Sequence, residues 1–306
     1  MSKIFFLTGA PRSGTTFASH ILKSISKIQY IHEPFDPRHG LIKSRYLYIN
    51  PNHCDEKFDD LFRGLLSNQI NYRSQPDPAD SRFKSLLKLG FGSKATYEII
   101  LNRFFRKSDT TLIKDPVGFF LSEYLFVNHG VMPIILIRHP IGFVTSFKRL
   151  NWDTFVEKLL LQRSLIENYF DGEDKNIREG IGLGIITEAS ILWKCYHQFL
   201  IKIIQKYPHW IIIKHEDLSN QPKRTFMKIF EYMKFADAAN LEKILPKYTE
   251  SSSNKQPKKV HELKRTSKNI LASNIRSLTM EERDQIFEIT KNVALHVYDK
   301  ESFQLK

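Results

Sequence analysis

The sequence has little cysteine and no long apolar run, and these absences exclude several classes of protein. Its two cysteines, Cys54 and Cys195, form no Cys-x-x-Cys pair, so zinc-ribbon and thioredoxin-like redox motifs are absent. No segment approaches the roughly 18 apolar residues that a membrane-spanning helix needs. The apolar run at residues 4–7 is too short for the core of a signal peptide. We therefore expect a cytoplasmic protein without a transmembrane segment.

Acidic residues are too few to balance the basic ones. The 306 residues include 46 Lys and Arg against 33 Asp and Glu, which gives a formal net charge of +13. This excess predicts an anionic partner, and nucleic acid, a membrane surface or a polyanionic small molecule would each serve. The basic residues are spread along the chain and are dense only over residues 255–268. That distribution disfavours nucleic acid, whose binding proteins cluster Lys and Arg among aromatic residues.

Short apolar runs alternate with amphipathic stretches, which predicts an α/β fold with a mainly parallel central sheet flanked by helices. Strands are expected at residues 4–8, 29–32, 111–114, 132–137 and 210–214. Helices are expected at residues 15–26, 151–169 and 188–207, from Pro222 onward, and after Thr279, whose pairing with Glu282 has the spacing of a capping box. Irregular connections are expected at residues 71–81, at the glycine-containing residues 171–184, and at 249–259.

The segment GAPRSGTT, residues 9–16, is almost a nucleotide-binding P-loop, but its lysine is missing. A P-loop reads G-x-x-x-x-G-K-[ST], and Thr15 stands at the lysine position after Gly9 and Gly14. A strand–turn–helix of this kind directs backbone N–H groups and the positive end of the helix dipole at an anion. Further donors would come from the side chains of Arg12, Ser13, Thr15 and Thr16.

The missing lysine argues against a nucleoside triphosphate as the ligand. P-loop kinases and ATPases use that lysine, together with Mg²⁺, at the β- and γ-phosphates. With Thr15 in its place, we expect a ligand with a less charged terminus and a site that needs no metal. A mixed anhydride of phosphate and sulfate fits, because its terminal sulfonate carries a single negative charge.

A second candidate anion site lies in RHPIGFVTS, residues 138–146. Arg138 follows an apolar strand, Pro140 stops the strand, and the following helix carries Ser146 about two turns later. If the loop folds back, both side chains can reach a crevice at the carboxyl end of the sheet, where open α/β sheets bind ligands. Arg138 can form two parallel hydrogen bonds with a phosphate, and Ser146 can donate a third.

Together these two segments resemble motifs of the sulfotransferase family. GAPRSGTTF is similar to the family's 5′-phosphosulfate loop, and RHPIGFVTS is similar to its 3′-phosphate motif. Weaker similarities lie in IKDP (113–116), in KHEDL (214–218) followed by Pro222, in Trp193, and in the segment 277–289 with Tyr298. The resemblance implies a three-layer, P-loop-like fold in one domain over residues 1–306, with a helical acceptor-site or lid region around residues 151–190.

The resemblance also implies a reaction, a donor and a set of site residues. The reaction would move a sulfonate group from 3′-phosphoadenylyl sulfate (PAPS) to a hydroxyl of a glycan, lipid or small molecule. Many cytosolic members have lysine at the position of Arg12. An arginine there is more similar to the carbohydrate and bacterial branches of the family. Some members bind the 3′-phosphate with a C-terminal Arg-Lys-Gly triplet, which this sequence lacks. Its most similar basic pair is Lys264 and Arg265. The donor-binding residues would be Arg12, Ser13, Gly14, Thr15, Thr16, Phe17, Arg138, Ser146, Lys264 and Arg265.

Sulfonate transfer needs a stabilised leaving group and a base for the acceptor hydroxyl. Arg12 would stabilise the leaving oxygen as a fixed cation. Glu33, in YIHEPF, is the candidate base because related members have a glutamate at the matching place. His32 should point the opposite way if the segment is a strand. We interpret Asp115 as structural or site-shaping, and Glu216 and Asp217 as helix-start and network residues.

Two other functions are compatible with the sequence. An atypical P-loop kinase would have to bind magnesium through an aspartate and tolerate Thr15. A non-catalytic basic protein would use the loop to hold nucleic acid or another anion.

Overall fold

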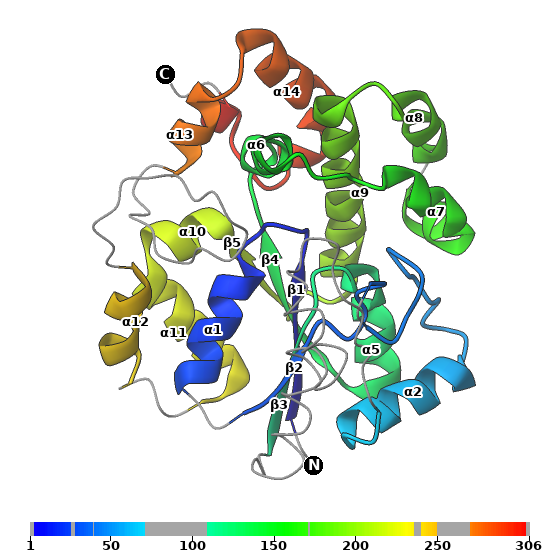
Figure 1. Cartoon of the computed structure of the whole chain (residues 1–306), viewed down its shortest axis with the longest axis vertical. Helices are drawn as coiled ribbons and strands as arrows, with labels where there is room; N and C mark the ends of the chain where they lie inside the picture. The colour runs from blue at the N-terminus through cyan, green and yellow to red at the C-terminus, as the bar shows by residue number, and fades with distance from the viewer. Residues whose placement is uncertain are drawn as a thin grey trace, which may run out of the picture. The chain divides into compact units, whose positions relative to one another are not determined.

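The computed structural model describes residues 3–25, 28–38, 40–70, 109–170, 172–235, 240–249 and 270–303. In these residues a five-stranded sheet with the strand order β2-β3-β1-β4-β5 is flanked by helices (Figure 1). Strand β3 pairs in parallel with both β1 and β2. The predicted α/β fold with a mainly parallel sheet is therefore confirmed.

The five strands lie where the apolar runs predicted them. Their bounds are β1 (Lys3–Gly9), β2 (Gln29–His32), β3 (Thr110–Lys114), β4 (Met132–Ile137) and β5 (Ile211–Lys214). Side chains along β3 and most of β1 and β4 are buried on both faces, as in parallel sheets covered by helices. Runs without polar alternation were therefore the correct signal for these strands.

The described chain divides into two compact units. Unit 1 comprises Met1–Gly9 and Lys27–Ile134, and unit 2 comprises Ala10–Ser26 and Ile135–Lys306. The assignment of residues 1–306 to one domain, and of residues 151–190 to an acceptor-site region, stays a prediction.

Unit 1 brings the carboxyl ends of three parallel strands to one edge. In the strand register Lys114 pairs with Leu7 of β1 and with His32 of β2. The Thr8 hydroxyl donates to the carbonyl of Asp115 at 2.7 Å, which joins β1 to the turn after β3. Gly9, which ends β1, and Glu33 and Asp115, which directly follow β2 and β3, consequently lie at the same edge.

In the described residues of unit 1 the helices are α2 (Glu56–Leu66) and α5 (Ser122–His129), with a 3₁₀ turn at Phe119–Leu121. They belong to a buried cluster that includes Phe6, Phe35, Phe58 and Phe62. Asp59 of α2 joins the two helices: its Oδ1 accepts a hydrogen bond from Tyr124 at 2.8 Å and lies 2.7 Å from His129 Nε2.

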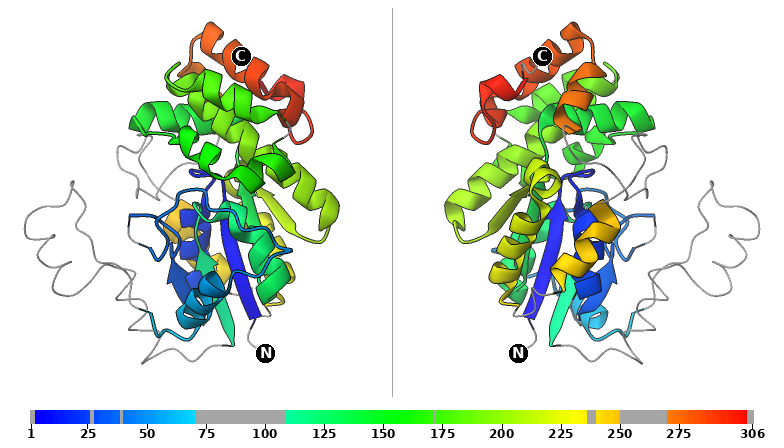
Figure 2. Two further views of the ribbon diagram at one scale, coloured as in Figure 1. Left: turned by 90° about the vertical axis from the view of Figure 1, so that its right-hand side faces the viewer. Right: turned by 90° about the vertical axis from the view of Figure 1, so that its left-hand side faces the viewer.

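Unit 2 is mainly helical. Its longest helix, α9, packs against α6 and against α14, which Figures 1 and 2 show in orange and red beside the green α9. No described helix is both long enough and apolar enough to cross a membrane. Where the structure describes this unit, its helices are α1 (Thr15–Ile25), α6 (Pro140–Leu150), α7 (Arg163–Tyr169), α8 (Glu173–Gly180), α9 (Ile185–Lys206), α10 (His215–Asn220), α11 (Pro222–Met233), α12 (Leu241–Thr249), α13 (Ile270–Arg276) and α14 (Met280–Ala294), with 3₁₀ turns at Val156–Leu161 and Lys300–Phe303.

The C-terminal helix begins as predicted. The Thr279 hydroxyl accepts a hydrogen bond from the Glu282 N–H at 3.2 Å, and the Glu282 carboxylate accepts one from the Thr279 N–H at 3.0 Å. The predicted capping box is confirmed, and α14 starts at Met280.

Two local predictions in unit 2 were wrong. Residues 151–169 are not one helix, because Asn151 and Phe155 both take left-handed backbone angles and separate α6 from a 3₁₀ turn and α7. Residues 171–184 are not wholly irregular, because α8 forms there. Its buried Glu173 pairs with Lys194 of α9 at 2.6 Å, a tertiary contact that local composition does not reveal. Residues 71–81 and 250–259 lie outside the described residues.

We expect acid to weaken unit 1 through Asp59. Burial raises the pKa of Asp59, but hydrogen bonds from Tyr124, His129 and Cys54 outweigh burial and hold this pKa below its usual value. The stabilisation is therefore present above the unfolded-state pKa of about 3.9 and is lost as pH falls through the lower folded-state value. Urea unfolding measured from about pH 5 to about pH 2 should show a steeper loss of stability in wild type than in Asp59→Asn. Equal slopes would contradict this account.

Candidate functional site

The loop between β1 and α1 has the features of an anion cradle. Gly14 has φ +96°, and a Cβ at this position would lie 2.8 Å from His215 Nδ1, so glycine is required on both counts. The Ser13 hydroxyl is buried and has no hydrogen-bond partner among the described residues. A buried hydroxyl without a partner, directly before a helix N-terminus, favours an anion as its ligand.

Arg12 is held in place from three sides. Its φ of 71° is left-handed, a conformation that costs a non-glycine residue on the order of 1 kcal/mol. Its carbonyl accepts a hydrogen bond from Arg138 Nη1 at 3.0 Å, and its Nε donates to Ser146 Oγ at 3.1 Å. Its guanidinium carbon lies 5.3 Å from the ring centre of Trp152. The structure thus brings Arg12, Arg138 and Ser146 together, although the sequence assigned them to two separate motifs.

Arg138 directly follows β4 and is 4% exposed. A Cβ at Gly142, one turn into α6, would lie 2.8 Å from Arg138 Nε, so the glycine makes room for the guanidinium. The Trp193 indole donates to the Arg138 carbonyl at 2.8 Å. The backbone of Arg138 is therefore held by α9, while its side chain fits beside Gly142 of α6 and donates to the Arg12 carbonyl.

A second group of contacts supports the segment after Arg138. Glu216 accepts hydrogen bonds from the His139 N–H at 3.0 Å and from the Tyr298 hydroxyl at 3.3 Å. Burial, reinforced by the charges of Arg138 and Lys214, lowers the pKa of His139 to about 3, so its ring is neutral. Glu216 is a network residue, as the sequence indicated.

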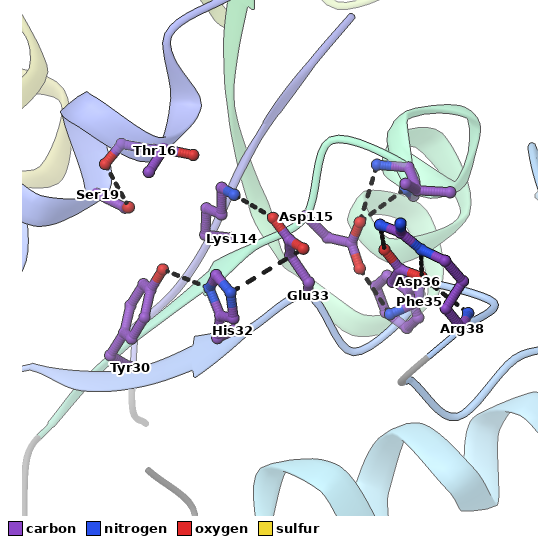
Figure 3. A network of polar contacts seen from close by, with 12 residues as sticks. Thr16, Ser19, Tyr30, His32, Glu33, Phe35, Asp36, Arg38, Lys114 and Asp115 are labelled. Carbon is purple, nitrogen blue, oxygen red and sulfur yellow. Dashed lines mark hydrogen bonds and ion pairs between the residues drawn. The ribbon is translucent and has the colours of Figure 1, made fainter. Parts of the chain in front are cut away.

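In unit 1 the candidate base Glu33 forms an ion pair with Lys114 (Figure 3). The Lys114 side chain is 2% exposed and that of Glu33 is 26% exposed. Burial raises the pKa of Glu33, but the charges of Lys114 and His32 outweigh it and leave this pKa below its usual value. Glu33 is therefore a carboxylate at neutral pH and can accept a proton.

His32 does not point away from Glu33, so that prediction was wrong. Glu33 has φ 46°, which breaks the alternation of side chains at the end of β2. As a result His32 Nε2 lies 4.0 Å from a Glu33 carboxylate oxygen, while its Nδ1 lies 3.1 Å from the Tyr30 hydroxyl (Figure 3).

Asp115 has the structural role that the sequence indicated. Its carboxyl oxygens accept hydrogen bonds from the backbone N–H groups of Phe35 at 2.6 Å, Val117 at 2.8 Å and Gly118 at 3.1 Å. Burial, together with the charge of Glu33, raises its pKa to about 8, and the bonds from Phe35 and Gly118 oppose this rise. Asp115 thus fixes the turn that carries Glu33.

Sequence reasoning missed Lys114 and Gly142 as site residues. A lysine that ends the apolar strand TTLIK was a usable signal, because a buried ammonium needs a carboxylate partner. Among the predicted donor residues, Thr15 is buried and Phe17 packs on Phe226 with ring centres 5.9 Å apart. Lys264 and Arg265 lie outside the described residues. Donor binding stays a prediction for all ten residues that the sequence assigned to it, including Arg12, Arg138 and Ser146.

Comparison with known proteins gives structural neighbours only. No protein-family model matches the sequence, and no curated protein does. The chain resembles the sulfotransferase domain from the curacin biosynthetic pathway at 16% identity, with a TM-score of 0.38 and coverage of 99% of this chain and 95% of that one. It resembles the sulfotransferase domain of the Synechococcus PCC 7002 olefin synthase at 17% identity, with a TM-score of 0.46 and coverage of 97% and 95%. It resembles sulfotransferase STF9 from Mycobacterium avium at 14% identity, with a TM-score of 0.43 and coverage of 97% and 77%. These low sequence identities and TM-scores do not establish a function for this chain.

We expect Glu33 and Lys114 to stabilise the fold only as a pair. Glu33→Ala should cost about 3 kcal/mol of unfolding free energy, because it leaves the buried Lys114 ammonium without its carboxylate. Adding Lys114→Met to Glu33→Ala should restore most of this loss. Urea denaturation of the two variants and the wild type measures both effects. A double variant that is no more stable than Glu33→Ala would contradict the pairing.

Proposed function

We propose that this chain is a sulfotransferase that moves a sulfonate group from PAPS to a hydroxyl group of a glycan, lipid or small molecule. One observation carries the proposal: Arg12, Arg138 and Ser146 are joined by hydrogen bonds around a loop that has no P-loop lysine. Two arginines and a buried serine hydroxyl beside that loop suit a ligand with two separated anionic groups.

The residues of unit 2 fit such a donor. Gly14 allows a ligand to approach the backbone closely, and the buried Ser13 hydroxyl has no partner in the described part of the chain. We assign the loop and Arg12 to the phosphosulfate end and Arg138 with Ser146 to the 3′-phosphate. When bound, the donor would supply a sulfonate attached to a phosphate leaving group. We further propose that it binds without a metal, because its terminal group lacks the charge of a γ-phosphate.

In the proposed reaction the acceptor oxygen forms a bond to sulfur while the bond from sulfur to the bridging oxygen breaks. The electron pair of that bond goes to the phosphate, where Arg12 and the N–H groups of the loop stabilise the negative charge. Arg12 cannot donate its proton at neutral pH, so its contribution is electrostatic. Its fixed position matters, because a preorganised cation costs no reorganisation during the reaction.

Glu33 is the proposed acceptor of the proton from the attacking hydroxyl. Its lowered pKa supports this role in one respect and limits it in another. The carboxylate is available throughout the neutral range, but it is a weaker base than an ordinary glutamate. The Lys114 ammonium, which lowers the pKa, would also stabilise negative charge nearby.

Calorimetric titration tests the donor assignment directly. We expect the purified protein to bind adenosine 3′,5′-bisphosphate equally well with and without Mg²⁺, and to bind ADP and ATP more weakly. Arg138→Met and Ser146→Ala should each weaken bisphosphate binding roughly 10- to 100-fold if they lose charge-assisted hydrogen bonds. Arg163→Met is the matched control, since Arg163 is an exposed arginine that pairs with Glu167 on α7.

Three results would contradict the proposal. Preference for ATP with Mg²⁺ would favour an atypical kinase. Equal weakening by Arg163→Met would mean that net charge, and not the built site, attracts the ligand. Binding to DNA and RNA that falls steeply with salt, without bisphosphate binding, would favour a non-catalytic anion-binding protein.

A further inference from the structure

Trp152 contacts the guanidinium of Arg12 and has no part in the function proposed so far. The Arg12 guanidinium carbon lies over the indole at 5.3 Å from the ring centre, within the range of a cation–π interaction. The indole itself is braced by Phe147, whose ring lies 6.0 Å away at an interplanar angle of 87°. Trp152 is partly buried, so its ring is neither a core residue nor a freely solvated one.

The backbone that carries Trp152 is firmly held on both sides. Asn151, with φ 48°, is the left-handed C-cap of α6, and the Trp152 N–H donates to the Phe147 carbonyl at 3.2 Å. On the other side Phe155 has a φ of 49°, a left-handed conformation that is strained for an aromatic residue. Asp153 accepts a hydrogen bond from the Phe155 N–H at 2.8 Å, and the buried Thr154 hydroxyl donates to Glu188 at 2.8 Å. Such strain persists only where surrounding contacts over-determine it, and it concentrates at functional sites.

An aromatic ring is a suitable support for a cation that must bind an anion. A carboxylate would orient the guanidinium but would also neutralise its charge. A ring orients the guanidinium by cation–π attraction and leaves the charge available. Holding the long arginine side chain in one position also reduces the rotamer entropy that ligand binding would otherwise cost.

We propose that Trp152 is a positioning residue that orients Arg12 toward the 5′ end of the donor. This inference rests on the proposed function, because it takes Arg12 as the residue for that end. Trp152 itself need not touch the donor. Its loss should therefore weaken recognition of the 5′ group and leave recognition of the 3′-phosphate unchanged.

Two nucleotide ligands distinguish recognition of the 5′ group from recognition of the 3′-phosphate. Calorimetry should compare adenosine 3′,5′-bisphosphate with adenosine 3′-monophosphate, which lacks the 5′ group. Trp152→Leu should weaken the bisphosphate about 3- to 30-fold, the range of a cation–π contact, and change the monophosphate less than about twofold. Trp152→Phe keeps an aromatic face and should recover most of the affinity. Asp153→Ala loosens the same segment but keeps the ring, so it should weaken the bisphosphate clearly less than Trp152→Leu does.

Several outcomes would overturn the inference. Unchanged bisphosphate binding by Trp152→Leu would show that the ring does not orient Arg12. Equal weakening of both nucleotides, or an equal loss in Asp153→Ala, would show that the segment matters only for local structure. If wild type bound neither nucleotide, the proposed function would fail as well, so the two failures are distinguishable.

Indole fluorescence gives a second test if Trp152→Leu does not fold. The chain has three tryptophans, and Trp193 and Trp210 are both buried. Bisphosphate should change the emission of wild type, because anion binding alters the cation next to Trp152. The change should be much smaller in Trp152→Phe, where only the contribution of Trp193, which donates to the Arg138 carbonyl, would remain. A change of the same size in that variant would contradict the contact on which the inference rests.

Discussion

A buried guanidinium needs partners in a fixed geometry, and Arg138 imposes this requirement on unit 2. Its side chain donates to the carbonyl of Arg12, so it ties the anion-binding loop to the start of α6. Its own carbonyl is fixed by Trp193 of α9. The glycine at position 142 is needed because any larger residue would collide with the guanidinium. The loop, α6 and α9 are therefore positioned around one side chain.

Unit 1 meets the same physical requirement with a lysine. The ammonium of Lys114 lies at the buried end of a parallel strand, and the carboxylate of Glu33 compensates it. To reach Lys114, Glu33 takes a left-handed backbone conformation, and Asp115 holds the neighbouring turn through backbone N–H groups. This pairing also decides the protonation of Glu33, because the positive charge outweighs the effect of burial on its pKa. Structural stability and the proposed chemistry thus depend on one ion pair.

The sequence predicted the strands and most helices because their signals are local. Apolar runs of isoleucine and leucine located β3 and β4, and the Thr279–Glu282 spacing located the start of α14. The failures came where distant contacts decided the outcome. The helix α8 forms in a glycine-containing segment that packs against α9, where Glu173 meets Lys194 and Ile177 is buried. The expected helix over residues 151–169 is interrupted because Asn151 and Phe155 adopt left-handed angles that other contacts enforce.

Local sequence is enough to predict the alternation of strands and helices, the glycine-bounded loop without a lysine, and the residue types that can hold an anion. These properties follow from side-chain chemistry and short-range spacing. The tertiary structure alone decided that Arg12 contacts Ser146, that Trp152 supports Arg12, and that Glu33 meets Lys114 and His32. Each of these contacts joins residues from different elements or depends on a left-handed residue. Both features arise from packing, which no local pattern encodes.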